Sequence, residues 1–204
     1  MIAVVDYGIG NLRSAEKALQ HLGADAQLTN DARTIDAADA VVLPGVGAFG
    51  ACMNALRSSG LEDATKTAAS DGRPFLGICI GMQMLFDGSD ESPGTAGLGI
   101  VPGRVTLLPR TERLPQIGWN TLAVSKGSRL CADLGAEPWL YFVHSYAPEP
   151  VDDAVIAARC EYGRSFAAAI EQGPVWATQF HPEKSGATGL RLLENFVDAA
   201  VSRN

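Results

Sequence analysis

The chain has 204 residues, of which 47% are hydrophobic and 19% charged, with no long Pro/Ser-rich or single-sign tract. This composition excludes a largely disordered protein, and the length favours a single domain over residues 1–204. A formal net charge of -7, without any run of Lys or Arg, predicts no nucleic-acid partner.

The sequence predicts a cytoplasmic protein with no membrane contact and no cofactor. The N-terminus opens on a short apolar run, residues 2–5, instead of a basic segment followed by a long apolar one. No later apolar run reaches membrane-spanning length. The four cysteines are scattered and form no CxxC pair, so neither a disulfide framework nor a zinc site is expected.

In the first half, apolar strand-like runs alternate with helical patterns. Strands are predicted at residues 2–6, 40–43 and 74–78, and helices at 12–22 and at 48–71, the latter interrupted by Gly60. The first helix places Leu12 and Leu19 on one face and ends at Gly23. This alternation predicts an α/β fold with a mostly parallel open sheet flanked by helices, as in flavodoxin-like proteins.

The second half contains strand-like runs separated by turn residues, near 98–108, 120–125, 139–147, 154–160, 165–171 and 174–180. We expect them to extend the sheet with antiparallel strands. A final stripe of Leu190, Leu193, Val197 and Val201 predicts a closing helix packed on the sheet.

Cys79 lies in Gly77-Ile78-Cys79-Ile80-Gly81, where a strand gives way to a helix. Such a junction is typical of a nucleophile elbow, in which glycines relieve crowding and the next backbone N–H faces an oxyanion. The helix N-terminus also favours the thiolate. The competing interpretation is a small buried core residue, the commoner fate of a cysteine in a parallel sheet.

His181 and Glu183 follow an apolar run in Gln179-Phe180-His181-Pro182-Glu183. Extended backbone would place both side chains on one face, and Pro182 biases His181 toward that conformation. Glu183 could then orient the imidazole, giving a Cys-His-Glu triad suited to acyl transfer from an amide. Without Cys79, a solvated pair at a strand end would be the preferred interpretation of the two residues.

Two further segments are candidates for the walls of a site. The turn Pro44-Gly45-Val46-Gly47 follows a core strand and could supply an oxyanion N–H, although it lacks the spacing of a phosphate loop. His144 belongs to an aromatic-rich strand, 141–146, where a sealed core would leave its ring unsatisfied. By contrast, His21 lies at the margin of the first helix, where a structural role is expected.

Together these motifs resemble the class I glutamine amidotransferases, over nearly the whole chain. The segments at residues 6–12, 44–49, 118–120 and 141–146 are most similar to glutaminase subunits of imidazole glycerol phosphate synthase. The resemblance implies glutamine hydrolysis through a thioester, with ammonia channelled to a (β/α)8-barrel cyclase subunit in a heterodimer that serves histidine biosynthesis. The product would be imidazole glycerol phosphate together with an aminoimidazole carboxamide ribotide.

The resemblance also implies roles for individual residues. Cys79, His181 and Glu183 would form the catalytic triad, and the backbone N–H groups of Val46, Gly47 and Ile80 the oxyanion site. The glutamine-binding set would be Gln83, Glu91, His144, Ser145 and Tyr146, with Glu91 facing the substrate ammonium. The cyclase interface would include Asn11, Trp119, Asn120 and Lys184.

Three other interpretations stay open at the level of sequence. One is a glutaminase subunit of a different synthase, such as that for pyridoxal phosphate, against which the segments at 6–12, 44–49 and 118–120 argue. Another is a related cysteine hydrolase acting on peptides. The third is a flavodoxin-like binding module without catalysis, in which Cys79 and His181 only pack.

Overall fold

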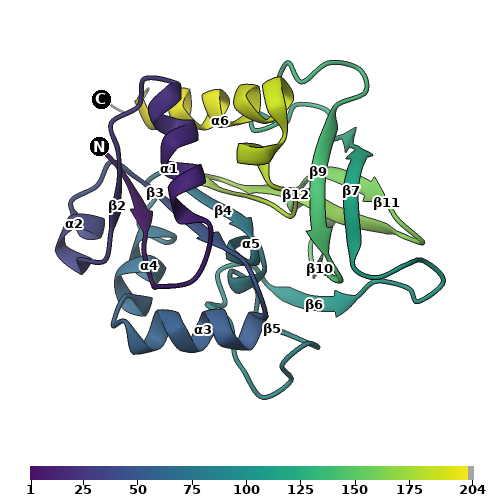
Figure 1. Cartoon of the computed structure of the whole chain (residues 1–204), viewed down its shortest axis with the longest axis horizontal. Coiled ribbons are helices and arrows are strands. Elements are labelled where there is room, and N and C mark those ends of the chain that lie inside the picture. Colours follow the sequence, from purple (N-terminus) through teal and green to yellow (C-terminus); the bar gives the residue numbers. More distant parts are fainter. Residues whose placement is uncertain (202–204) are drawn as a thin grey trace.

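The computed structural model describes residues 1–201 and forms a mixed α/β structure around an eight-stranded sheet (Figure 1). The helices are α1 (Leu12–His21), α2 (Ala32–Asp36), α3 (Phe49–Ser58), α4 (Glu62–Ala68), α5 (Ile80–Met84) and α6 (Gly186–Val201), with 3-10 turns η1 (Asp153–Val155) and η2 (Pro182–Lys184). The strands are β1 (Ile2–Val5), β2 (Ala26–Thr29), β3 (Ala40–Gly45), β4 (Phe75–Cys79), β5 (Gly88–Ser89), β6 (Gly103–Leu107), β7 (Gln116–Thr121), β8 (Ala123–Val124), β9 (Trp139–His144), β10 (Tyr146–Pro150), β11 (Ile156–Glu161), β12 (Ser165–Gln172) and β13 (Val175–Thr178).

The main sheet has the order β2-β1-β3-β4-β13-β12-β11-β8. Strands β2, β1, β3, β4 and β13 are parallel, whereas β12, β11 and β8 continue the sheet in antiparallel pairing. The predicted fold class is therefore confirmed. Every residue of β1, β3, β4 and β13 is buried, as expected of parallel strands covered on both faces.

Helices cover both faces of this sheet. In Figure 1, α1 and α6 lie on one side, with α3 and α4 on the other. The prediction for α1 is confirmed, since Leu12, Ala15 and Leu19 are buried and Gly23 follows the helix with a φ of 82°. A helical pattern interrupted at Gly60 is also observed, as α3 and α4.

The second half departs from the expected single extended sheet. Strands β5, β6 and β10 form a separate three-stranded sheet, and β7 pairs only with β9. The predicted run at 98–108 is a strand only over Gly103–Leu107, and the one at 120–125 begins earlier, at Gln116. Alternating apolar residues identify a strand but not its partner, because pairing depends on contacts distant in sequence.

The closing helix forms, but the face that it buries is rotated from the predicted stripe. Its buried residues include Leu192, Leu193 and Phe196, whereas Val201 is 64% exposed. Gly189 faces the loop before the helix, and a Cβ there would lie 2.0 Å from the carbonyl oxygen of Pro182. Only glycine permits this close approach of α6 to the loop, so this face of the helix is buried against the loop.

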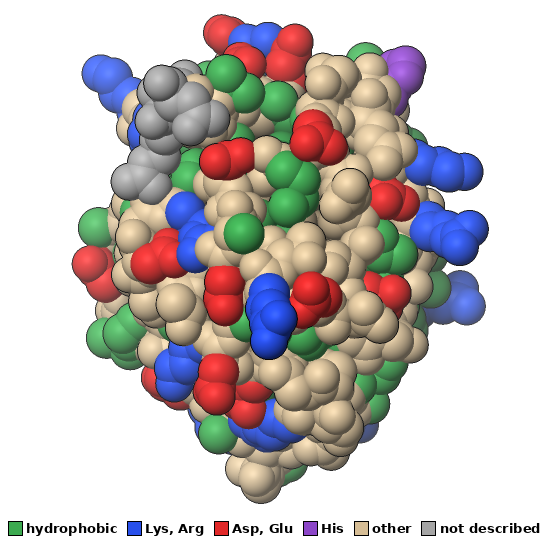
Figure 2. All heavy atoms as spheres, turned by 90° about the vertical axis from the view of Figure 1, so that its left-hand side faces the viewer, with side chains coloured by type: hydrophobic (Ala, Val, Ile, Leu, Met, Phe, Trp, Pro, Cys, Tyr) green, Lys and Arg blue, Asp and Glu red, His purple; other side chains and the backbone are tan. Residues whose placement is uncertain are grey.

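The surface carries charges of both signs. The face in Figure 2 shows acidic and basic side chains interspersed, without a continuous basic stretch. Among residues 1–201, no helix is both long enough and apolar enough to cross a membrane.

Candidate functional site

Cys79 ends β4 and immediately precedes α5, as the elbow prediction requires. Its φ of 56° and ψ of -110° are strained for a residue with a side chain. A Cβ on Gly77 would lie 2.9 Å from the Gly81 carbonyl oxygen, and one on Gly81 only 1.8 Å from that of Leu43. The two glycines therefore let the first turn of α5 pack directly on β3 and β4. The Cys79 side chain is 3% exposed, so it opens to a cavity and not to the outer surface.

His181 reaches the same edge of the sheet because β13 runs parallel to β4, with Thr178 opposite Ile78. Its Nδ1 lies 2.8 Å from Oε1 of Glu183, and the two side chains are only 2% and 4% exposed. The pair is thus buried, which excludes the interpretation as a solvated pair. His181 is extended as predicted, but Pro182–Lys184 forms a 3-10 turn, because the fixed φ of proline suits a first helical position.

The imidazole of His181 is set up to carry charge. Burial disfavours the imidazolium, but the neighbouring Cys79 sulfur and Glu183 carboxylate outweigh it and raise the pKa of His181 to about 9. With Nδ1 facing Glu183, Nε2 is left without a hydrogen-bond partner among residues 1–201. This nitrogen is available to exchange a proton with a group in the cavity.

A cavity of about 270 Å³ brings nearly all of the predicted site residues together. Its lining consists of Val46, Gly47, Cys79, Ile80, Gln83, Glu91, Pro115, Val143, His144, Ser145, Tyr146 and His181. Glu183 is not in the lining and contacts the site through His181. Pro115 and Val143 were not expected from the sequence. The cavity is smaller than the roughly 300–1,000 Å³ clefts that hold drug-sized ligands, and this size suits a free amino acid.

Two polar side chains of the lining have atoms left for a ligand. Oε2 of Glu91 accepts a hydrogen bond of 2.7 Å from the backbone N–H of Phe49, and its carboxylate keeps further acceptor capacity. Nε2 of Gln83 donates to the carbonyl oxygen of Tyr146 at 3.0 Å, while its Oε1 is buried without a partner among the described residues.

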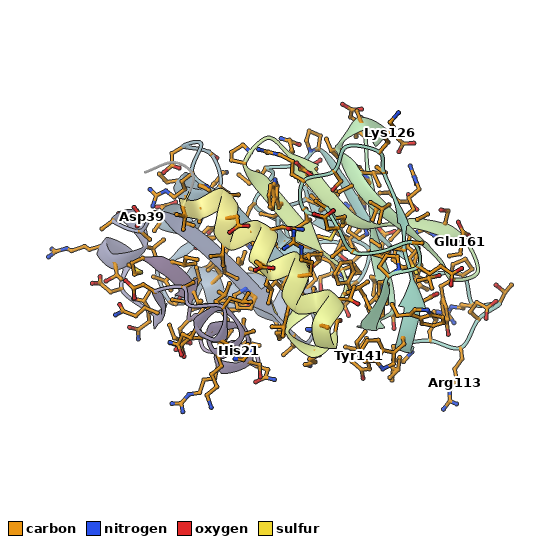
Figure 3. The ribbon with its side chains drawn as sticks, turned by 90° about the horizontal axis from the view of Figure 1, so that it is seen from above. His21, Asp39, Arg113, Lys126, Tyr141 and Glu161 are labelled. Atoms are coloured by element: carbon orange, nitrogen blue, oxygen red, sulfur yellow. The ribbon has the colours of Figure 1, made fainter. Side chains whose placement is uncertain are left out.

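His144 is a buried wall of the site. Its Nδ1 lies 2.8 Å from the carbonyl oxygen of Tyr146, and its ring packs against Phe142 and Phe166. Burial is the main cause that lowers the pKa of His144 to about 4, so the ring is neutral at pH 7. His21, by contrast, is exposed at the end of α1 (Figure 3), and it does not pack at the margin of the core as the sequence indicated.

Two side chains that do not line the cavity hold the end of β3 and the turn after it by hydrogen bonds to backbone carbonyl groups. The Tyr7 hydroxyl donates to the carbonyl oxygen of Pro44 at 2.9 Å, and the Cys52 thiol donates to that of Val46 at 3.3 Å. These contacts fix the turn while Val46 and Gly47 line the cavity. Ile80 is the first residue of α5, so its N–H has no acceptor within the helix.

The predicted interface residues lie in different settings. Asn11 and Lys184 are exposed, and Trp119 is 52% exposed. The amide of Asn120 instead donates to the carbonyl oxygen of Glu161 at 2.9 Å and accepts from the N–H of Thr121. Asn120 therefore ties β7 to β11 and uses both atoms of its amide group within the chain.

Gln179 is a site residue that sequence reasoning passed over. It is fully buried, and its Nε2 lies 3.8 Å from the Cys79 sulfur. A signal was available, because a glutamine inside the apolar run 175–180 is costly unless it is hydrogen bonded. No group of three or more His, Cys, Asp or Glu within residues 1–201 is arranged to hold a metal ion.

Comparison with known proteins agrees with this geometry. The family "Glutamine amidotransferase class-I" matches residues 3–200. The subunit HisH of imidazole glycerol phosphate synthase from Methanothermobacter thermautotrophicus is 51% identical over 199 residues, which cover 97% of this chain and 98% of that protein. The subunit of the same name from Synechocystis sp. is 50% identical over 202 residues, covering 96% of this chain and 95% of the relative.

Solved structures share the fold at low sequence identity. A crystal structure of a glutamine amidotransferase superposes with a TM-score of 0.78 at 23% identity, covering 98% of this chain and all of that one, 100%. The PurLQS structure from Thermotoga maritima gives a TM-score of 0.75 at 21% identity, with coverage of 99% and 97%. Because the family match spans residues 3–200 and the relatives align over nearly their full length, this chain belongs to the class I glutamine amidotransferase family.

Proposed function

We propose that this chain is the glutamine-hydrolysing subunit of an imidazole glycerol phosphate synthase and supplies ammonia to a cyclase subunit for histidine biosynthesis. Relatives named as the HisH subunit of that enzyme align over nearly their whole length at 44–51% identity. The observation that carries the proposal is the meeting of the strained Cys79 with the buried His181–Glu183 pair in one small cavity.

The chemistry follows from the positions of these three side chains. Nε2 of His181 takes the thiol proton, and the sulfur of Cys79 attacks the carboxamide carbon of glutamine. When the tetrahedral intermediate collapses, the C–N bond breaks and His181 returns the proton to the leaving nitrogen, releasing ammonia. Water then hydrolyses the thioester to glutamate. Glu183 keeps Nδ1 protonated and stabilises the imidazolium between these steps.

The remaining lining residues account for binding and oxyanion stabilisation. Ile80, at the start of α5, and Val46 and Gly47 line the cavity, and their backbone N–H groups would stabilise the oxyanion. The Glu91 carboxylate has the charge to bind the substrate ammonium, and Gln83 has a free Oε1 to accept a hydrogen bond. His144, Ser145 and Tyr146 also line the cavity and would complete the glutamine site.

An exposed apolar face provides the docking site for the cyclase, which the resemblance describes as a (β/α)8 barrel. Strands β7 and β9 pair so that Ile117, Trp119, Trp139, Tyr141 and Val143 share one face. Ile117 is 63% exposed and Trp139 51%, and Trp119 packs edge-on against Tyr141 at 6.1 Å between ring centroids. Large exposed aromatic side chains of this kind are typical anchors in protein interfaces.

This face is bonded directly to the loop that carries His181. The N–H of His181 donates to the carbonyl oxygen of Tyr141 at 3.0 Å, and the N–H of Tyr141 donates to Oγ of Ser185 at 2.9 Å. Figure 3 shows Tyr141 beside the start of α6, next to this loop. Docking on β7 and β9 therefore acts close to the imidazole, and we expect glutamine hydrolysis to be stimulated by the partner.

The test measures glutamate release from glutamine by wild type and by Cys79→Ala, each alone and mixed with a purified cyclase subunit and its ribonucleotide ligand. Cyclisation driven by added ammonia is the control for an intact cyclase. We expect hydrolysis by wild type only, stimulated by the cyclase complex, and cyclisation by the Cys79→Ala mixture when ammonia is added.

Two outcomes would contradict the proposal in different ways. Wild-type hydrolysis that the cyclase leaves unchanged would mean that the partner belongs to another synthase. Hydrolysis by Cys79→Ala would mean that the sulfur is not the nucleophile.

A Trp119→Ala variant that keeps its fold should lose stimulation at low cyclase concentration, whereas the exposed Val151→Ala should not.

A further inference from the structure

A buried hydrogen-bonded chain runs from His144 to the candidate nucleophile. Its central members are Gln83, on α5, and Gln179, just after β13, which are 1% and 0% exposed. Nε2 of Gln83 donates to Oε1 of Gln179 at 2.9 Å, and Nε2 of Gln179 donates to Sγ of Cys79 at 3.8 Å. The backbone N–H of Gln179 is itself fixed by the carbonyl oxygen of Ala168 at 2.8 Å.

The orientation of both amides is determined by one carbonyl group. The carbonyl oxygen of Tyr146 can only accept, and it faces both Nδ1 of His144 and the side-chain amide of Gln83. Gln83 must therefore turn its NH2 group toward Tyr146, and the same NH2 group faces Gln179. Gln179 must in turn present its oxygen to Gln83. Its NH2 group is then directed at the sulfur.

We infer that Gln179 is a further catalytic residue, whose amide N–H stabilises the Cys79 thiolate; this rests on the function proposed above. His181 and Gln179 would have complementary tasks at the sulfur, because His181 removes the proton while Gln179 donates to the charge left behind. Hydrogen bonds to an ionised group are stronger than those to a neutral one, and burial strengthens them further. The amide is also held rigidly before the charge appears.

The contribution changes along the reaction. When the Cys79 proton moves to Nε2 of His181, the sulfur becomes negative and gains most from the Gln179 N–H. When the sulfur forms its bond to the carboxamide carbon, the carbonyl electron pair moves to oxygen and the sulfur charge is lost. The bond from Gln179 weakens at that point, so it favours formation of the thiolate; it strengthens again when the C–S bond breaks during hydrolysis of the thioester and the charge returns to the sulfur.

A purely structural role is the alternative, since Gln179 also joins the end of β13 to α5 through Gln83. Two variants separate the roles. Gln179→Met has similar length and removes every polar atom, whereas Gln179→Glu keeps an acceptor for Gln83 and removes the donor toward the sulfur. Asn195→Leu is the matched control, because Asn195 on α6 is also a buried amide, and it donates to the carbonyl oxygens of Leu130 and Ala132 instead of to a residue of the cavity.

The experiment measures iodoacetamide alkylation of the Cys79 peptide against pH by mass spectrometry, which resolves it from the other cysteines. The same variants are assayed for kcat and KM with glutamine in the cyclase complex, and for melting temperature. Both Gln179 variants should alkylate about tenfold or more slowly at neutral pH, with the rise in rate moved to higher pH. The loss in kcat/KM should match, and Asn195→Leu should lose melting temperature only.

Wild-type alkylation profiles in both Gln179 variants, with only a lower melting temperature, would overturn the inference. A wild-type complex that fails to hydrolyse glutamine, while the Gln179 variants still alkylate slowly, would refute the proposed function and leave the amide-to-sulfur contact standing. The alkylation measurement needs no substrate, so the two failures are distinguishable.

Discussion

The strained backbone at Cys79 makes a stability prediction that is independent of catalysis. Its φ of 56° and ψ of -110° belong to a region that glycine adopts freely and that other residues occupy at a cost of roughly 1–3 kcal/mol. Replacement by glycine removes this cost, whereas replacement by alanine keeps it. Both changes remove the thiol, so the difference in stability between Cys79→Gly and Cys79→Ala reports the energetic cost of the backbone conformation at position 79.

Cys160 supplies the matched control pair. It lies in β11, it is 2% exposed against 3% for Cys79, and it is not among the non-glycine residues with positive φ. At Cys160, alanine should be the more stable replacement, because glycine adds about 0.4–1 kcal/mol of unfolded-state entropy and loses a buried methyl group worth about 0.8 kcal/mol. These two contributions are common to both positions and cancel in the comparison.

The stability of the glycine variant relative to the alanine variant should thus be about 1–3 kcal/mol more favourable at position 79 than at position 160. Urea denaturation of the four variants measures this difference, and thermal unfolding checks it, at about 2–4 °C for each kcal/mol in a chain of this length. Equal glycine-minus-alanine differences at the two positions would show that the elbow stores no strain, and the reasoning would fail.

Three further predictions concern the surroundings of the elbow. The Gly81→Ala variant should not form the native junction of β4 and α5, because its Cβ would lie 1.8 Å from the Leu43 carbonyl oxygen. A cooperative thermal transition at the wild-type temperature would contradict this expectation. Glu183→Gln should lower the pKa of His181 below about 9 and reduce kcat about 100-fold or more; NMR titration of the ring and a pH–rate profile measure both, and an unchanged profile would exclude Glu183 from the triad. His144, whose pKa is lowered to about 4, takes up its proton near pH 6.5 only when the chain is unfolded, so the free energy of unfolding should fall by up to about 3 kcal/mol between pH 6.5 and 4. A His144→Phe variant should lose that part of the acid sensitivity, and an equally steep decline in the variant would assign it to other groups.

Local patterns in the sequence were sufficient to predict the central strands of the fold. The apolar runs of β1, β3 and β4 are buried on both faces, so they contain almost no polar residues to obscure them. The glycines around Cys79 identified the elbow, because the close packing at Gly77 and Gly81 leaves no room for a Cβ atom. The edge strand β2 and the short helix α2 were not predicted, since half-exposed elements leave a weak apolar pattern.

The sequence alone determined the α/β class, the alternation of strands and helices in the first half, and the motifs that carry Cys79, His181 and Glu183. Only the tertiary structure decided which strands pair, which face α6 buries, and which side chains of distant segments meet. Gln179 shows the reason. Its partners, Gln83 and Cys79, lie 96 and 100 residues away in sequence, so no local spacing could reveal a contact that parallel pairing of β13 with β4 creates.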